Sequence, residues 1–314
     1  LSAILGQTVQ LAPDCIGSET EAMVAAMKEG DVVLLENLRY HAGEQTNDPE
    51  FSRQLAALAD VYINNAFAVS HRAHASVVGI TEYIADKAAG FLLRKEMDYF
   101  HRSVDDPVHP LVAIIGGAKV SSKLGALVNM LDKVDALLIG GAMANTFLKS
   151  RGHGLGASKV EDDLLPEASS VLADARKKGV KVYLPVDVIA AAGFSAEAVT
   201  KQVTIQDIPE GWMALDIGPA SVLCFQEVLA DARTIIWNGP MGAFEMDPFA
   251  RGTMALAHTV GSAHALSITG GGDSNAAVKK FGEADNISYM STGGGAFLML
   301  MEGKELPGVA ALEK

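Results

Sequence analysis

The chain has 314 residues, of which 49% are hydrophobic and 20% are charged, and its formal net charge is −13. This length predicts about two domains, with enough apolar material for two cores. The negative charge argues against nucleic acids and anionic membranes as partners, because a basic surface supplies most of the attraction to both. No apolar run approaches the length of a membrane span, and no signal-peptide pattern opens the sequence, so we expect a cytoplasmic protein.

The two cysteines, Cys15 and Cys224, lie far apart in the chain, and neither belongs to a C-x-x-C pair. Free cysteine behaves as a small apolar residue, and disulfides are rare in reducing compartments. We therefore predict two small buried residues rather than a disulfide or a metal site.

The first third of the chain mixes short apolar runs with helical patterns. "DVVLLENLRYH" (31–41) predicts a strand that leaves into a polar loop, and "VYINNAF" (61–67) predicts a second strand. The segment 49–60 predicts a helix with Pro49 in its first turn. A longer helix is expected over 88–104, where the following Asp106–Pro107 pair should end it. We expect this helix to connect two domains.

From residue 107 onward, strands and helices alternate regularly. Strands are expected at 111–115, 136–140, 180–184, 234–237 and 264–269, with helical patterns between them, including 121–134 and 162–178. Such alternation predicts a parallel sheet with right-handed crossovers and helices on both faces, that is, a doubly wound α/β domain. Ligands of such domains bind at the carboxyl ends of the strands.

The segment "AIIGGAKVSSKLGALVNML" (113–131) places two lysines where a strand passes into a helix. The glycines Gly116 and Gly117 allow a tight turn and close approach of a ligand. A helix beginning near Ser121 would direct its free N–H groups and positive end toward an anion. Lys119 and Lys123 oppose that dipole unless a phosphate lies between them. The residues alone leave open that both lysines are ordinary solvated side chains.

Two further glycine-rich segments follow predicted strands. In "SITGGGDSNAAVKKFG" (267–282), Asp273 and Ser274 suit a helix cap, or Asp273 suits a magnesium ion with the Gly271 and Gly272 N–H groups facing a phosphate. "STGGGA" (291–296) predicts either a flexible linker or an anion-binding nest.

The sequence "TIIWNGPMGAFE" (234–245) ends a strand in a turn, and its polar residues suit either an ordinary turn or a nucleoside. "ENLRYH" and "HRAHAS", earlier in the chain, gather a basic cluster that suits a small polyanion, because Arg binds phosphate and carboxylate oxygens in pairs. Each histidine taken alone is more often structural. The residues of this cluster are Arg39, His41, His71, Arg72 and His74. Together these patterns indicate phosphoryl transfer by a two-lobed α/β protein.

The motifs as a set resemble the phosphoglycerate kinase family. "LLENLRYHAGE", "NNAFAVSHRAHAS", "GGAKVSSKL", "IGGAMANTFLK", "DIGP", "WNGPMGAFE", "ITGGGDSNAAV" and "STGGGAFL" occur in the family's order across essentially the whole chain. The resemblance implies a monomeric cytoplasmic glycolytic enzyme that transfers a phosphoryl group reversibly between 1,3-bisphosphoglycerate and ADP, giving 3-phosphoglycerate and ATP, with Mg²⁺. It implies two doubly wound lobes joined by a long helix that close by hinge bending. The expected ranges are 1–87 for a partial triose-binding lobe, 88–106 for the connecting helix, 107–295 for the nucleotide lobe and 296–314 for a segment returning to the first lobe.

The resemblance also implies a role for individual residues. Lys119 would stabilise the phosphoryl group in transit, with assistance from the backbone at Gly294 and Gly295. Lys123 would hold a nucleotide phosphate, and Asp273 the metal. Arg39 and Arg72 would bind the triose acid. The remaining nucleotide-binding residues implied by the family's motifs are Gly117, Gly141, Asn238, Pro240, Glu245, Gly271, Gly272 and Ser274.

Several departures from the family pattern bear on these expectations. The family's "R-x-D-x-N-V-P" strand does not occur, Asn65 stands for the usual Asp, and Ala142 replaces a Gly. We therefore expect a chain shortened at its N-terminus, with an incomplete first lobe and weak or absent turnover on its own. Two alternatives to the family's reaction remain: a non-catalytic nucleotide-binding fragment, and a kinase that acts on a different acyl phosphate.

Overall fold

The computed structural model describes residues 1–313 and divides the chain into two compact units. The first unit comprises Leu1–Lys95 together with the residues from Glu305 onward, and the second comprises Glu96–Lys304. The division falls within helix α5 (Phe91–Phe100).

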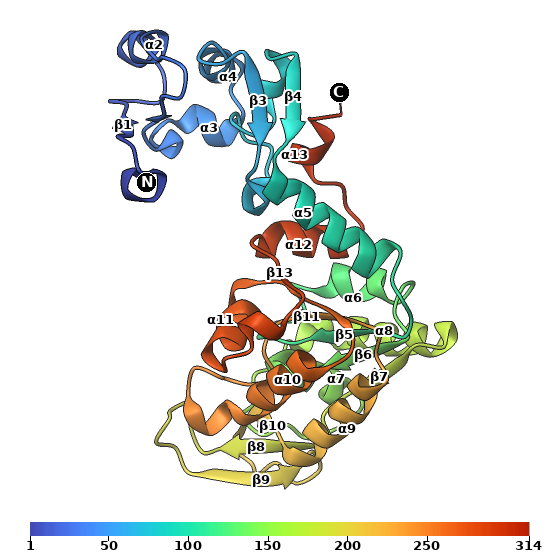
Figure 1. Ribbon diagram of the computed structural model, residues 1–314. Helices are drawn as coiled ribbons and strands as arrows, with labels where there is room; N and C mark the ends of the chain where they lie inside the picture. The colour runs from blue at the N-terminus through green and yellow to red at the C-terminus, as the bar shows by residue number, and fades with distance from the viewer. Residues whose placement is uncertain (314) are drawn as a thin grey trace. The chain divides into compact units, whose positions relative to one another are not determined.

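The second unit is built on a six-stranded parallel sheet with the order β13-β12-β11-β5-β6-β7 (Figure 1). The expected strands over 111–115, 136–140, 180–184, 234–237 and 264–269 are all confirmed, with ends shifted by a residue or two. Apolar residues fill the central strands because helices cover both faces and leave neither face in water. The strands are β5 (Leu111–Ile115), β6 (Ala136–Ile139), β7 (Lys181–Tyr183), β11 (Thr234–Asn238), β12 (Leu266–Thr269) and β13 (Tyr289–Met290).

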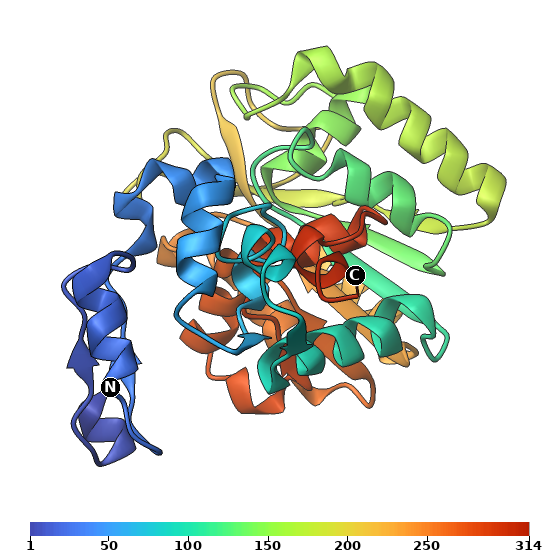
Figure 2. The same ribbon diagram turned by 90° about the horizontal axis from the view of Figure 1, so that it is seen from above.

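The helices of this unit pack on the two faces of the sheet, and Figure 2 shows α8 in yellow-green and α10 in orange on its opposite sides. One face of β5, β6 and β11 buries Ile114, Leu138 and Trp237 against Phe225 of α9 and Leu256 of α10. This confirms the predicted α/β fold with a parallel sheet. The helices are α6 (Leu124–Met130), α7 (Gly141–Ser150), α8 (Leu165–Lys178), α9 (Pro219–Ala230), α10 (Arg251–Ser262), α11 (Gly272–Lys280) and α12 (Gly294–Met301).

A smaller antiparallel sheet with the order β10-β8-β9 was not expected from the sequence. Its strands are β8 (Asp187–Ala191), β9 (Thr200–Thr204) and β10 (Met213–Ile217). The buried Asp187 joins this sheet to α9, because its carboxylate accepts the N–H of Ser221 in the first turn of that helix at 2.8 Å. The polar, weakly alternating sequence of β9 explains why it was missed.

The expected helix over 88–104 begins later than predicted. Residues Asp86–Ala89 form strand β4, which pairs in parallel with β3 (Val61–Asn64), and α5 starts at Phe91. The side-chain oxygen of Asn65 accepts the N–H of Leu92 at 2.7 Å, and so caps the first turn of the helix. A π-helical turn, His101–Asp105, ends it before Asp106.

The first unit contains two separate parallel strand pairs, β1 (Gln10–Leu11) with β2 (Val33–Leu34) and β3 with β4. Parallel pairing agrees with the prediction, but residues 1–95 do not form one doubly wound sheet, and the strand expected over 31–41 is limited to Val33–Leu34. The helices are α1 (Ser2–Leu5), α2 (Ser18–Ala25), α3 (Ala42–Thr46), α4 (Pro49–Ala56) and α13 (Pro307–Ala310).

A small apolar core holds this unit together. Phe51 and Leu55 of α4 pack with Ile80 and Cys15. Helix α4 begins after Asp48, whose carboxylate accepts the N–H of Phe51 at 2.8 Å, and Pro49 occupies its first turn as expected. Cys15 is fully buried, whereas Cys224 on α9 is exposed, so the prediction of two buried cysteines was wrong for the second. Among residues 1–313, no helix has both the length and the apolar character needed to cross a membrane.

Candidate active site

Four glycine-containing loops converge at the carboxyl edge of the large sheet, because each follows a parallel strand. Backbone hydrogen bonds join them. The N–H of Gly117 donates to Pro240 at 3.1 Å, the N–H of Gly141 donates to Met241 at 3.0 Å, and the N–H of Gly270 donates to Trp237 at 2.9 Å. The predicted glycine-rich segments that follow β5, β6, β11 and β12 therefore form one continuous surface.

Backbone conformation favours glycine at two positions at the centre of this surface, and close packing also requires it at the second, Gly141. Gly117 has φ 115° and Gly141 has φ 68°, in the region that side chains disfavour. A Cβ on Gly141 would meet the backbone nitrogen of Gly117 at 2.5 Å. These two loops therefore approach each other as closely as backbone atoms allow.

A cavity of about 460 Å³ opens at this edge, a size typical of small-molecule sites. Five of the sequence-predicted residues line it: Gly117, Gly141, Pro240, Glu245 and Asp273. The departure Ala142 also lines it. The remaining lining residues were not predicted: Ala118, Ala157, Lys159, Phe194, Met213, Ala214, Leu215, Gly242 and Ala243.

The apolar end of the cavity comes from the unpredicted antiparallel sheet. Met213, Ala214 and Leu215 belong to β10, and Phe194 lies in the loop that joins β8 to β9. Phe194 remains 69% exposed although it lines the cavity, so a flat apolar ligand would cover it. "AAAGFSAEAV" around Phe194 carries no glycine-rich or charged pattern, and no signal in the sequence could have identified it.

The two lysines that follow Gly117 are arranged differently from the prediction. Helix α6 begins at Leu124, so Lys119 and Lys123 lie in the turn before the helix rather than one helical turn apart. The reason is that the N–H of Lys123 donates to Val120 at 2.9 Å, which closes a tight turn before the first helical residue. Lys119 is exposed, whereas the Lys123 side chain folds inward.

The ammonium group of Lys123 lies among backbone carbonyls, donating to Gly116 at 2.6 Å and to Asn238 at 2.8 Å. Burial lowers the pKa of Lys123 to about 8, although the charge of Asp273 works in the opposite direction. The lysine therefore connects the ends of β5 and β11 next to Gly117, which lines the cavity.

Two helix N-termini meet near Asp273. Helix α11 follows Gly271 and α12 follows Gly293, and the Cα of Gly271 lies 3.0 Å from the position that a Cβ on Gly294 would occupy. Free N–H groups at both helix starts favour an anion. The alternative that Asp273 or Ser274 caps α11 was wrong, because Gly271 occupies the cap position and no side chain caps that helix.

Asn238 and Ser274, both predicted to contact the ligand, have their side chains engaged within the protein. Asn238 donates to the carbonyl of Gly270 at 2.9 Å. The Ser274 hydroxyl accepts the N–H of Gly239 at 2.6 Å and donates to Gly270 at 2.9 Å. Both side chains are buried, so they hold the loops after β11 and β12 against each other.

The basic cluster belongs to the first unit, where Arg39 and Arg72 are exposed. His41 lies 2.7 Å from a carboxylate oxygen of Asp14, and His74 is buried 3.5 Å from Glu44. These two histidines are therefore structural, as their most common role predicts.

His71, next to Arg72, has a buried Nδ1 with no hydrogen-bond partner among residues 1–313. Burial, and then the charge of Arg72, lower the pKa of His71. With His71 neutral, the exposed guanidinium groups of Arg39 and Arg72 are the cations that this basic cluster offers to an anion.

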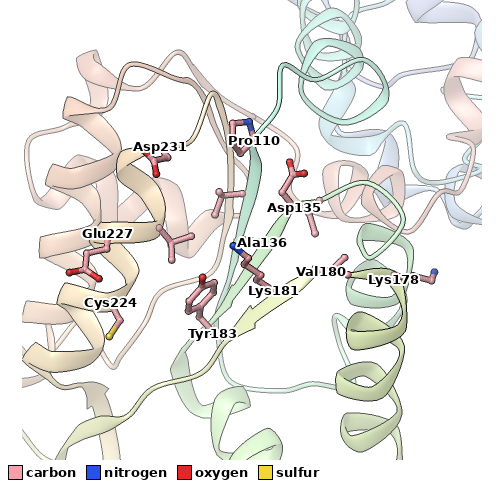
Figure 3. Close-up of a pocket in the computed structure, with 14 residues that line it drawn as sticks. Pro110, Asp135, Ala136, Lys178, Val180, Lys181, Tyr183, Cys224, Glu227 and Asp231 are labelled. Atoms are coloured by element: carbon pink, nitrogen blue, oxygen red, sulfur yellow. The ribbon is translucent and has the colours of Figure 1, made fainter.

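A larger hollow of about 630 Å³ lies in the second unit, between α9 and the starts of β5, β6 and β7 (Figure 3). Figure 3 shows Cys224 and Glu227 of α9, and Asp231 just after its end, across the hollow from Lys181 and Tyr183. It lies at the amino ends of the strands and contains neither a glycine-rich loop nor a predicted residue. The smaller cavity at the carboxyl edge therefore remains the candidate site.

Comparison with known proteins agrees with this geometry. A sequence profile described as "Phosphoglycerate kinase" matches residues 1–304. The chain belongs to the phosphoglycerate kinase family. Members of this family are glycolytic kinases, which are phosphotransferases.

Individual relatives align along nearly the whole chain. The phosphoglycerate kinase of Desulfotalea psychrophila is 66% identical over 313 residues, which cover 100% of this chain and 80% of the relative. That of Pelobacter propionicus is 58% identical, with 78% of the relative covered. Among solved structures, phosphoglycerate kinase from Coxiella burnetii is similar with a TM-score of 0.87 and 43% identity, over 91% of this chain and 74% of that one. The structure from Pyrococcus horikoshii has a TM-score of 0.86 and 31% identity, over 100% and 80%.

The residues present fit the magnesium that the phosphoglycerate kinase family implies. Asp273 is exposed at the cavity, and its carboxylate makes no hydrogen bond or ion pair within residues 1–313. Magnesium on nucleotide phosphates takes one or two protein carboxylates and keeps several waters. A single free carboxylate beside two helix N-termini meets that requirement.

Proposed function

We propose that the chain transfers a phosphoryl group reversibly between 1,3-bisphosphoglycerate and ADP, forming 3-phosphoglycerate and ATP. The observation that carries the proposal is one cavity with a chemically divided lining. Its apolar lining includes Phe194 and Met213, which suit a base, and the lining from the glycine-rich loops includes Gly117 and Asp273, which suit phosphates and their metal. A nucleotide matches this lining, because it combines a flat, largely apolar base with charged phosphates.

The cations and free N–H groups of this edge support transfer rather than binding alone. In the reaction, the bond between phosphorus and the carboxyl oxygen of the donor breaks, and a bond to a β-phosphate oxygen of ADP forms. The products are a carboxylate and ATP, so no proton has to be removed by a base. The protein's contribution is alignment and stabilisation of the charge on the transferring oxygens.

We assign the roles as follows. Lys119 is exposed and free to contact the transferring group, with the N–H groups of Gly294 and Gly295 at the start of α12 as further donors. Lys123 holds a nucleotide phosphate, and Asp273 holds Mg²⁺, which supplies further charge neutralisation when bound. Arg39 and Arg72 of the first unit bind the carboxylate and phosphate of the triose acid. We propose that the protein acts as a monomer in the cytoplasm.

The test is a coupled assay in which ATP formation from 1,3-bisphosphoglycerate and ADP is followed together with calorimetric binding of MgADP. Turnover that depends on Arg72 supports the proposal. Tight MgADP binding without turnover identifies a non-catalytic nucleotide-binding protein instead. Turnover of another acyl phosphate that Arg72→Ala leaves unchanged identifies a different kinase, because the basic cluster then has no role.

A further inference from the structure

Residues 118–122 of the turn that carries the two lysines make few polar contacts with the rest of the described protein. Gly117 is held on both sides of its peptide, because its N–H donates to Pro240 and its carbonyl accepts from Met143 at 3.0 Å. Some bonds of residues 118–122 are internal to the turn, such as that from the Ser122 hydroxyl to the carbonyl of Lys119 at 2.9 Å. The apolar anchor is Val120, which is fully buried.

One side chain supplies the polar support from outside. Within residues 1–313, the hydrogen bonds that reach residues 118–122 from other segments come from Glu161. Its carboxylate accepts the Ser121 hydroxyl at 2.5 Å and the Ser121 N–H at 3.1 Å, one on each oxygen. Such charge-assisted bonds are about twice as strong as neutral ones. Glu161 therefore binds the middle of the turn, between the two lysines.

Glu161 is itself held by the helix that holds the start of the turn. Its N–H donates to the hydroxyl of Thr146, a buried residue of α7, at 3.1 Å. The carbonyl of Lys159 in the same segment accepts from Asn145 at 3.2 Å. Helix α7 also provides Met143, which holds Gly117. The start of the lysine turn is thus held directly by helix α7, and its middle is held by α7 through Glu161.

The electrostatics of Glu161 agree with this role. Burial acts to raise the pKa of Glu161, but the hydrogen bonds from Ser121 and the N–H of Val120, and the charge of Lys119, lower it overall. The carboxylate is therefore ionised at neutral pH. A fixed negative charge beside Lys119 also reduces the repulsion between two ammonium groups in one short turn.

We propose that Glu161 is a positioning residue, which holds the Lys119–Lys123 turn in the conformation that binds the nucleotide phosphates. The inference rests on the proposed function, since it assigns the turn to those phosphates. It adds a residue that lies outside the cavity and outside the glycine-rich motifs.

The experiment compares the full chain with Glu161→Gln, which keeps the shape of the side chain and removes its charge. Asp163→Asn is the matched control, because Asp163 is exposed, two residues away, and without a hydrogen bond or ion pair among residues 1–313. Affinities for MgATP and for adenosine are measured by calorimetry, and hydrogen exchange is followed over residues 118–124. Ser121→Ala, which removes one of the two bonds, is a second variant with less risk to folding.

Glu161→Gln is expected to lower the affinity for MgATP about tenfold and to change the affinity for adenosine by no more than about twofold. Amide exchange in the turn should become faster. Ser121→Ala should weaken MgATP by a smaller factor, and Asp163→Asn should resemble the parent. A Glu161→Gln protein with the parent's ratio of MgATP to adenosine affinity overturns this inference and leaves the proposed function intact. Equal loss of both ligands also overturns it, because the role is then general stability. A parent protein that binds MgATP no better than adenosine overturns both proposals.

Discussion

The ammonium group of Lys123 lies 2.8 Å from the carbonyl oxygen of Asn238, and so joins the turn after β5 to the loop after β11. A lysine in this position is held by neutral acceptors and not by a carboxylate. Because no negative charge compensates its burial fully, the pKa of Lys123 falls to about 8. The site is therefore prepared for an anion that supplies the missing charge.

This arrangement predicts that nucleotide affinity depends on pH above 8. A bound phosphate favours the charged form, so the pKa of Lys123 rises on binding and the protein takes up a proton at pH 8 to 9. MgADP affinity should fall as pH rises, by up to about tenfold per pH unit. Calorimetry at pH 9 in two buffers of different ionisation enthalpy measures the proton uptake. A Lys123→Met protein should bind more weakly and show a flatter profile, and an equally steep profile in that variant would contradict the assignment.

Lys119 is predicted to act on turnover more than on binding. It is exposed and makes no ammonium contact within residues 1–313, so its removal should leave the fold intact. Loss of one donor to a developing charge typically costs about 10²–10³ in kcat. Lys119→Ala should show that loss, with MgADP affinity within a few-fold of the parent. Lys177→Ala, at the exposed end of α8, is the control for lost positive charge. Unchanged kcat in Lys119→Ala would remove Lys119 from the mechanism.

We expect the effect of Mg²⁺ on nucleotide affinity to depend on Asp273. Its carboxylate is free at the cavity, so Asp273→Asn should reduce the gain in ADP affinity that Mg²⁺ provides, while metal-free ADP binds as well as before or better. Calorimetry with and without Mg²⁺ measures this difference. Asp285→Asn changes an exposed acid in the loop after α11 and should have no effect. A Mg²⁺ response retained in full by Asp273→Asn would place the metal elsewhere.

The parts of the site that could be predicted from sequence are those that depend on backbone chemistry. Gly117 and Asp273 were singled out because glycines after apolar strands indicate close approach of loops at a sheet edge, whereas Gly141 was implied only by the resemblance to the phosphoglycerate kinase family. Phe194 could not be identified in this way, since it reaches the cavity through the packing of a separate antiparallel sheet. Glu161 was missed for the same reason, because its contact with Ser121 joins residues 40 positions apart.

The predicted boundaries of helices were wrong where a hydrogen bond or strand pairing opposed the helical pattern of the sequence. The apolar spacing over 121–134 is helical, but the bond from Lys123 to Val120 forms a turn and delays α6 to Leu124. Ala88 and Ala89 favour a helix by propensity, yet pairing of β4 with β3 places them in a strand. In both cases the deciding contact involves geometry that periodicity does not encode.

The cap formed by Asn65 predicts a measurable loss of stability in the first unit. Its side-chain oxygen accepts the N–H groups of Leu92 at 2.7 Å and Leu93 at 3.4 Å. Asn65→Ala should lower the free energy of unfolding by about 1 kcal/mol, the usual value of such a cap. Asn65→Asp should retain the cap and add a favourable charge at the N-terminus of α5. Urea unfolding followed by circular dichroism measures both, and an alanine variant as stable as the parent would show that the bond contributes nothing.

We expect the contribution of the Asp216 carboxyl group to the free energy of unfolding to fall as pH rises from 4 to 7. Asp216, in β10, is buried against the start of α10, and its carboxylate accepts the N–H of Gly252 at 2.7 Å. Burial raises the pKa of Asp216 to about 7, although hydrogen bonds from Gly252 and Ile217 act against that rise. Because the ordinary value is 3.8, the folded protein binds more protons than the unfolded chain between pH 4 and 7. The contribution of this group is therefore greatest near pH 4 and decreases as the carboxyl ionises.

Asp216→Asn removes that titration while keeping an oxygen that can accept from Gly252. The melting temperature of the variant should consequently rise relative to that of the parent as pH is raised from 5 to 8. Other groups titrate equally in both proteins and cancel in this difference. Asp207→Asn, a change to an exposed acid in the loop after β9, should give a difference that does not vary with pH. A pH-independent difference for Asp216→Asn would mean that the buried carboxyl is already ionised at pH 5, held by the two N–H groups that face it.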